Sequence, residues 1–169
     1  MAVIGDKVVR ALNQQLNREI YSAYLYLSMS AYFESIGLKG FAGWMRAQWH
    51  EELMHAMKFF DYISSRGGRV ELFAIEEPPK SWESPLSAFE HALEHEMKVT
   101  KLIDELVDLA IVEKDHATFN MLQWFVGEQV EEEKTFREIV ERLKMLKDEK
   151  SALFLLDAEL GQRKFGGEE

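Results

Sequence analysis

The sequence contains no cysteine. That absence excludes a disulfide-stapled scaffold, thiolate catalysis, and zinc or iron sites built on sulfur ligands. No stretch approaches the roughly 20 apolar residues of a membrane-spanning helix, and residues 1–14 hold no uninterrupted apolar run of the kind that a secretory signal needs. We therefore expect a cytoplasmic protein without a membrane partner.

Proline and positive charge are also scarce. Only three prolines occur, Pro78, Pro79 and Pro85, all in one short window, so long uninterrupted helices are permitted on both sides of it. The net charge of −10 at pH 7 argues against nucleic acid as a partner and favours cations. With 169 residues, of which 47% are hydrophobic, the chain is long enough to bury most of its apolar surface as one domain over residues 1–169.

What the sequence does contain is a helical spacing of apolar residues, which recur at alternating steps of three and four. We expect a first helix from about Asp6 to Ser35 and a second from about Lys39 to Ser65. The link Gly37–Gly40 between them is so short that the two helices must be antiparallel neighbours.

The segment from Arg69 to Ser84 predicts one long crossover between the second and third helices. About sixteen extended residues reach at most ~55 Å, whereas a helix of ~27 residues is only ~40 Å long, so the segment can span the whole bundle. Ser84 and Pro85 form a good cap and first turn for the third helix, and a link near residues 114–116 leads to a fourth. We expect an all-α four-helix bundle over about residues 6–147, a short fifth helix over about 149–161, and a frayed tail.

All four long helices interrupt their apolar stripe with side chains of the metal-binding kind. On the second helix Glu52 and His55 lie one turn apart on the inner face, and Glu-x-x-His is a metal-ligand spacing. A buried charge without a partner costs several kcal/mol, so these side chains need something that neutralises them. The interruptions are Glu19, Glu52, His55, Glu96, Gln129 and Glu132.

These interruptions repeat along the chain. Glu19 precedes Glu52 by 33 residues and Glu96 precedes Gln129 by 33 residues, so two helical hairpins related by a pseudo-twofold would bring all six side chains into one layer. The four carboxylates carry about four negative charges, which two divalent cations would balance. Oxygen-rich ligands with one imidazole suit iron, and also manganese or zinc.

Four groups of residues resemble bacterial non-haem ferritins over essentially the whole chain. They are Leu16–Tyr26, Glu51–His55, His95–Glu96, and Phe119–Phe125 followed by Glu128–Lys134. The resemblance implies a ferritin-like bundle of the di-iron kind, in which carboxylates and a Glu-x-x-His motif project into the core. It also implies oxidation of Fe(II) by dioxygen or hydrogen peroxide, and storage of the ferric product in a hollow homo-oligomeric shell of 24 subunits.

The same resemblance implies residue roles. Glu19, Glu52 and His55 would hold the first iron, and Glu52 would bridge to a second iron held by Glu96 and Glu132, with Gln129 nearby. Tyr26 matches a tyrosine beside the centre, although its spacing alone indicates a core aromatic. A third, weaker iron site is implied at three acids whose periodicity by itself indicates a solvated face; they are Glu51, Glu128 and Glu131, with Glu132 shared.

Two departures from related families matter. Bacterioferritins have a haem-ligating methionine after the bridging glutamate, whereas this chain has Leu53, so no haem is expected. Animal ferritins line an iron channel with carboxylates in the first turns of the fourth helix, but Thr118–Leu122 carry none. The sequence therefore does not indicate where iron would enter.

Two other readings compete with iron storage. A rubrerythrin-type di-iron oxidase or peroxidase without storage is weakened because the chain lacks the cysteines of a rubredoxin module. A helical interaction protein of the cytokine kind would leave the acids in the core unexplained. We expect a ferroxidase that stores iron.

Overall fold

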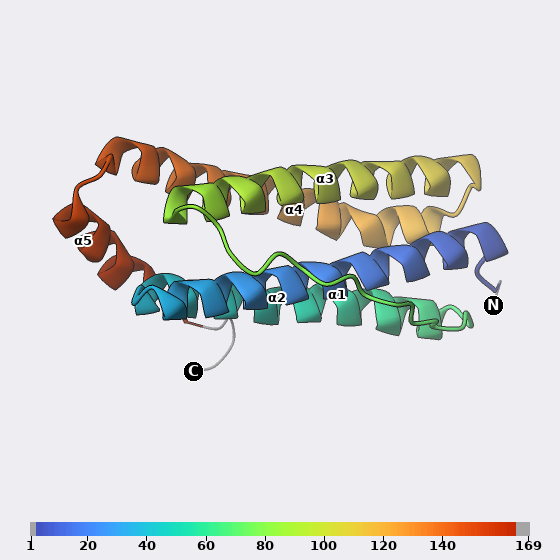
Figure 1. Cartoon of the computed structure of the whole chain (residues 1–169). Helices are drawn as coiled ribbons and strands as arrows, with labels where there is room; N and C mark the ends of the chain where they lie inside the picture. Colours follow the sequence, from blue (N-terminus) through green and yellow to red (C-terminus); the bar gives the residue numbers. More distant parts are fainter. Residues whose placement is uncertain (1–2, 165–169) are drawn as a thin grey trace.

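The computed structural model describes residues 3–164. Its helices are α1 (Asp6–Ser35), α2 (Lys39–Ser65), α3 (Pro85–Val112), α4 (His116–Leu146) and α5 (Lys150–Leu160). Helices α1 to α4 lie side by side as a long bundle, in which α1 pairs with α2 and α3 with α4, and α5 lies across one end (Figure 1). The predicted all-α bundle with a short fifth helix is confirmed.

The breaks between helices have local causes in the sequence. Gly37 adopts φ +79°, which glycine tolerates best, and the N–H of Leu38 then donates to the carbonyl of Phe33 at 3.0 Å to close α1. At the start of α3 the Ser84 side chain accepts from the N–H of Ser87 at 3.1 Å, in a reciprocal capping box. These breaks fix the lengths of the helices and hence the height at which each side chain meets its neighbours.

The crossover from α2 to α3 runs along the outside of the bundle over its length, as predicted (Figure 1). The side chain of Asn13 holds its beginning, since Asn13 Nδ2 donates to the carbonyl of Arg69 and Asn13 Oδ1 accepts from the N–H of Glu71, both at 2.9 Å. Trp82 anchors its end on α3, where Nε1 donates to Nδ1 of His91 at 3.0 Å. The long connection makes α2 and α3 parallel, so that each half of the bundle is an antiparallel hairpin.

The apolar core consists of two clusters with a polar layer between them. One cluster, near α5, includes Phe33, Phe41, Phe89 and Phe136; the other, toward the N-terminal end of α1, includes Leu12, Leu16, Phe59 and Phe125. Each fully buried side chain of this size contributes about 1.5–3 kcal/mol. The two clusters therefore provide the stability that lets the bundle carry a polar layer.

Helix α5 docks on the beginning of α2. The N–H of Phe41 donates to Asp157 Oδ1 at 2.8 Å, and a β-carbon at Gly40 would lie 1.7 Å from the backbone oxygen of Asp157, so the close approach requires glycine. The apolar run on α5 is only partly covered within one chain, because Leu156 is 3% exposed whereas Leu155 is 74% exposed. The chain by itself thus leaves Phe154 and Leu155 exposed on α5, and these two side chains form what we call the apolar strip.

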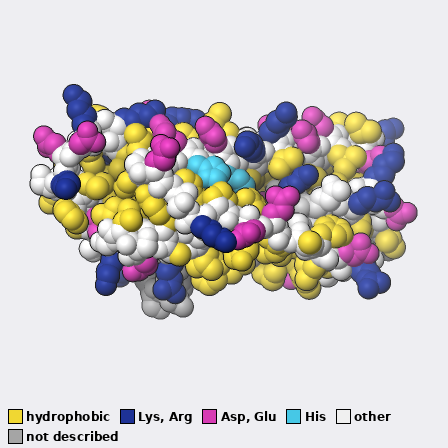
Figure 2. All heavy atoms as spheres, in the orientation of Figure 1, with side chains coloured by type: hydrophobic (Ala, Val, Ile, Leu, Met, Phe, Trp, Pro, Cys, Tyr) yellow, Lys and Arg dark blue, Asp and Glu magenta, His cyan; other side chains and the backbone are white. Residues whose placement is uncertain are grey.

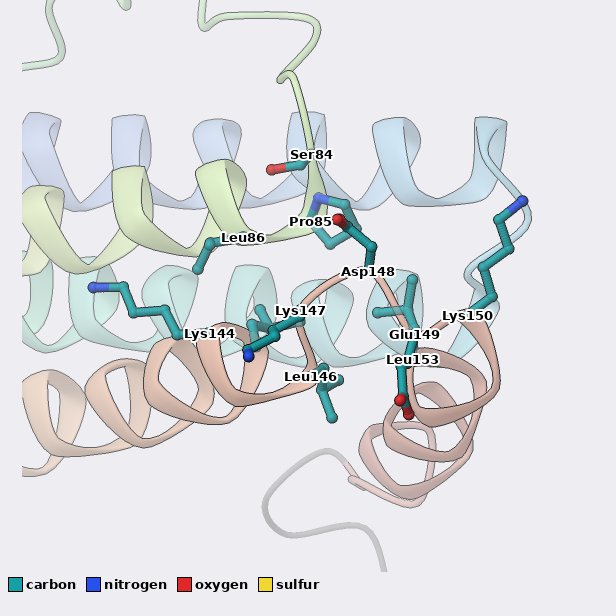
Figure 3. A pocket seen from close by; sticks show the side chains of 11 residues that line it. Ser84, Pro85, Leu86, Lys144, Leu146, Lys147, Asp148, Glu149, Lys150 and Leu153 are labelled. Atoms are coloured by element: carbon teal, nitrogen blue, oxygen red, sulfur yellow. The ribbon is translucent and has the colours of Figure 1, made fainter.

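A cleft of about 390 Å³ opens where α4 gives way to α5, next to the start of α3 (Figure 3). Leu86 and Leu153 form part of its apolar wall, and Lys144 and Lys147 lie along its edge. The turn itself has Lys147 at φ +51°. Over residues 3–164, no helix is long and apolar enough to cross a membrane.

Candidate metal centre

The structure brings the six polar interruptions of the sequence into one buried layer. They come from all four long helices, at the height where the two apolar clusters meet. None is more than 5% exposed: the set is Glu19 on α1, Glu52 and His55 on α2, Glu96 on α3, and Gln129 and Glu132 on α4. The face of the molecule shown in Figure 2 mixes acidic and basic side chains, whereas the ionisable ligand candidates of this layer are four acids and one imidazole.

The first group of possible metal ligands consists of Glu19, Glu52 and His55, whose ligand atoms all lie within 4.8 Å of one another. His55 Nδ1 is 3.4 Å from Glu52 Oε2 and 3.9 Å from Glu19 Oε2. Glu19 Oε2 is buried and has no hydrogen-bond partner. A buried carboxylate oxygen that has no hydrogen-bond donor is available to coordinate a cation.

The second group consists of Glu52, Glu96 and Glu132, also with ligand atoms within 4.8 Å of one another. Glu52 belongs to both fully buried groups, so its carboxylate lies where it could contact two ions at once. A third group joins His55 and Glu132 to the half-buried Glu128. The arrangement therefore offers two adjacent positions for cations in the core and a further one toward the surface.

Neutral donors orient the acids. Gln48 Nε2 donates to Glu132 Oε2 at 2.7 Å and to Glu52 Oε1 at 3.2 Å, and Gln15 Nε2 donates to Glu19 Oε1 at 2.9 Å. Amides position carboxylates but supply no positive charge. The amides thus orient these carboxylates without pairing them with a positive charge.

Glu96 has two donors of its own. Gln129 Nε2 donates to Glu96 Oε2 at 3.1 Å, and the hydroxyl of the fully buried Tyr26 donates to Glu96 Oε1. Tyr26 also stacks on Phe136, with ring centroids 5.6 Å apart. In this arrangement Gln129 and Tyr26 contact an acid of the layer, and both are thereby placed beside the second group.

Burial sets the protonation of the acids before any metal binds. It raises the pKa of Glu132 to about 8, and the charge of Glu96 adds to this effect. Burial, with help from neighbouring carboxylates, also holds the pKa of Glu19 and of Glu52 well above the ordinary value. Near neutral pH some of these groups therefore hold protons that a divalent cation must displace.

The three outer acids border the buried layer on its solvent side. Glu51 and Glu128 are half-buried and Glu131 is exposed. All three line a cleft of about 270 Å³ that reaches Glu132 at its inner side. The structure thus places them next to the centre, on the side that faces solvent.

Two cations flank these outer acids, and each lies over a tryptophan. Lys58 Nζ is 4.1 Å from the ring centroid of Trp124, and Trp124 in turn packs edge-on against His55 with ring centroids 5.4 Å apart. The Arg163 guanidinium is 4.3 Å from the ring centroid of Trp44. Trp44 and Trp124 therefore do more than pack, since they also support charged side chains beside the centre.

The expectation of a frayed tail is wrong for Arg163. This side chain contacts Glu51, Gln48 and Trp44 on α2, because α5 ends close to the outer acids and an arginine there finds a carboxylate partner. The remainder of the expected tail, residues 165–169, lies outside the described residues.

Comparison with known proteins identifies the family. Residues 9–146 match the model of the ferritin-like domain. The chain belongs to the ferritin family. This ferritin is 48% identical over 161 residues to the bacterial non-heme ferritin of Bacteroides fragilis, which covers 95% of this chain and 100% of that relative. It is 40% identical to the bacterial non-heme ferritin of Campylobacter jejuni, over 92% of this chain and 93% of the relative.

A solved structure is still more similar. The protein described as a novel open pore ferritin from the hyperthermophilic archaeon Archaeoglobus fulgidus is 63% identical to this ferritin, with a TM-score of 0.95 over 95% of this chain and 99% of that one. The relatives and the carboxylate-rich layer together support an iron-storage ferritin over the rubrerythrin-type and cytokine-type alternatives. Iron oxidation in general fits the same family.

Proposed function

We propose that this ferritin is a ferroxidase, which oxidises Fe(II) at a di-iron centre inside the helical bundle of each subunit. Glu19, Glu52 and His55 would bind one iron, and Glu96 and Glu132 the other, with Glu52 contacting both. The observation that carries the proposal is the sharing of Glu52 by two buried ligand groups. A lone structural ion pair would not need five ionisable side chains from four helices in one layer.

The electron balance requires two irons together. Each Fe(II) gives up one electron, and dioxygen takes two electrons and two protons to become hydrogen peroxide; alternatively, hydrogen peroxide takes two electrons and two protons to become water. A paired site delivers both electrons from one place, which a single-metal site cannot do. The protons that leave the buried carboxyls on iron binding are released next to the same site.

The neighbouring side chains have positioning roles in this scheme. Gln48, Gln129 and Tyr26 fix the carboxylates of Glu132 and Glu96 by hydrogen bonds, so less reorganisation is needed when iron enters. The outer acids Glu51, Glu128 and Glu131 would hold a third, weaker iron at the mouth of the cleft.

We also propose that the subunits form a hollow homo-oligomeric shell of 24 copies that retains the ferric product. The apolar strip on α5, with Phe154 61% exposed and Leu155 74% exposed, would be buried between subunits, since soluble proteins avoid such patches. Action in the cytoplasm stays a prediction.

The route of iron into the shell is part of the proposal. Thr118 is buried and Phe119 is 37% exposed at the start of α4, and neither side chain carries the negative charge of an acidic channel. Because the similar archaeal protein is described as an open pore ferritin, we propose that iron enters this shell through openings between subunits instead of an acidic channel at α4.

One experiment tests oxidation and storage together. Fe(II) is added aerobically to the purified protein, the ferric absorbance is followed by stopped flow, and the particles are then examined by electron microscopy. We expect fast oxidation and hollow particles with dense cores. Fast oxidation without cores would favour the rubrerythrin-type alternative, and oxidation no faster than in protein-free buffer would contradict the proposal. The matched control is Glu141→Ala, which removes an exposed acid of α4 outside the layer.

A further inference from the structure

The tail that follows α5 delivers an arginine to the mouth of the outer cleft. Arg163 Nη2 lies 2.9 Å from Glu51 Oε2 and donates to Gln48 Oε1 at 3.0 Å, and Arg163 Nη1 donates to the carbonyl of Trp44 at 3.4 Å. The side chain is only 20% exposed. Four contacts of different kinds, including the stacking on Trp44, hold this guanidinium in one place.

Gln48 connects this arginine to the buried layer. Its Oε1 accepts from Arg163, while its Nε2 donates to Glu132 and Glu52. The amide is therefore bound at both ends, and the guanidinium lies one side chain away from two acids of the candidate di-iron centre.

The position of Arg163 conflicts with a cation in the outer cleft. The cleft is lined by Arg163 together with Glu51, Glu128, Glu131 and Glu132. A guanidinium stays protonated at any physiological pH, so its positive charge attracts the same Glu51 carboxylate that a divalent cation would need as a ligand. A cation that takes Glu51 as a ligand must therefore separate it from Arg163.

We propose that Arg163 is a tethered counter-cation, which competes with divalent metal for Glu51 and so weakens the outer site relative to the buried pair. This inference rests on the proposed function, because it takes the outer acids to be a metal site. Iron that reaches the outer acids is therefore held weakly there and passes on to the buried pair. Among the described contacts of the buried acids, no arginine or lysine competes with a metal ion.

Lys58 provides a matched comparison. It also lies over a tryptophan and also lines a cleft that contains Glu51 and Glu128. Within residues 3–164, however, no ion pair joins Lys58 to either acid. Lys58→Gln and Arg163→Gln remove the same charge near the same site, but only Arg163→Gln frees Glu51.

The test is titration of the assembled, metal-free protein with Zn(II), which is redox-inert, followed by calorimetry and equilibrium dialysis. We expect Arg163→Gln to tighten the weakest class of sites about three- to fivefold, the range that loss of a partly exposed ion pair allows. Binding to the two tighter sites should stay unchanged. Lys58→Gln should tighten the weak class clearly less, and Arg163→Lys, which keeps the charge but loses the planar guanidinium, should also tighten it less than Arg163→Gln does.

The outcomes separate the two claims. Suppose that Zn(II) occupies the buried pair in all variants, and that Arg163→Gln and Lys58→Gln change the affinity of the weak class equally or not at all. The inference about Arg163 is then wrong and the proposed function stands. It is also wrong if Arg163→Lys behaves like Arg163→Gln. If Zn(II) does not bind to the buried layer of the parent protein, the proposed function fails and the inference falls with it. A double variant with Glu51→Gln should abolish the effect of Arg163→Gln.

Discussion

His55 Nδ1 lies 3.4 Å from Glu52 Oε2, one helical turn earlier on the same face of α2. The carboxylate that faces this imidazole also belongs to the group formed with Glu96 and Glu132. One side chain on α2 thus joins the ligands of α1 to those of α3 and α4.

Glu52→Ala should therefore abolish rapid iron oxidation more completely than Glu51→Ala. We expect the initial rate to fall about 100-fold or more for Glu52→Ala, since losing even an outer partner of a metal ligand commonly costs about 10–100-fold. Glu51→Ala should cost less, because Glu51 lies in the outer cleft. Stopped-flow oxidation assays on both assembled variants make the comparison, and an equal loss of rate would show that the assignment of Glu52 is wrong.

The stability of the metal-free protein should fall as the pH rises from about 5 to about 8. Glu132 has its pKa raised by burial to about 8, so the folded state binds a proton that the unfolded state has lost above its ordinary value. Stability is then full at low pH and is lost as the pH rises through the folded-state pKa.

Saturating Zn(II) should raise the melting temperature and reduce this pH dependence, because the metal neutralises the carboxylates. Thermal melts at pH 5, 6.5 and 8 measure both effects, and Glu132→Gln should show a smaller slope without metal. Melts with and without metal that superimpose would count against a site in the core.

Tyr26→Phe should destabilise the metal-free protein more than the metal-loaded one. The Tyr26 hydroxyl donates to Glu96 in the fully buried layer, and removing the donor leaves a buried acceptor that costs about 1–3 kcal/mol. A bound cation would take over that oxygen and reduce the loss. Thermal midpoints of both forms provide the measurement, and an equal shift in the two would argue against Glu96 as a ligand.

Truncation after Lys150 should weaken the shell while leaving the four long helices and their buried ligands largely in place. All the candidate ligands lie at or before Glu132, whereas α5 carries the apolar strip with Phe154 and Leu155. Leu155→Asp changes a side chain that is 74% exposed in the single chain, so an effect on particle mass would reflect assembly and not folding.

Light scattering after size exclusion, together with retention of ferric mineral, tests both forms. If the truncation and Leu155→Asp both give stable, mineral-retaining particles with the full number of subunits, α5 has no part in assembly.

Much of the fold follows from local sequence signals. The predicted bounds of the first two helices, Asp6–Ser35 and Lys39–Ser65, are those observed, because glycines end both helices and a helical apolar stripe runs between them. The acids of the buried layer could be predicted from the same apolar stripe, since each stands at a position where the stripe requires an apolar residue.

The residues that sequence reasoning missed have partners far away along the chain. Gln48 lies on the same stripe as Glu52, but its partner Glu132 is 84 residues later. Arg163 follows the last helix, where no periodicity predicts a direction, and it finds Gln48 across 115 residues. Long polar side chains of this kind are placed by tertiary packing, on which spacing carries no information.

The central claim is that one carboxylate, Glu52, joins two metal positions in the core. Anomalous diffraction from crystals soaked in Fe(II) without oxygen, or in Zn(II), tests it most directly. We predict two peaks about 3.5–4 Å apart inside the bundle, one beside Glu19 and His55, the other beside Glu96 and Glu132, with the Glu52 carboxylate reaching both. A single peak in the core, or peaks only at Glu51, Glu128 and Glu131, would contradict the account.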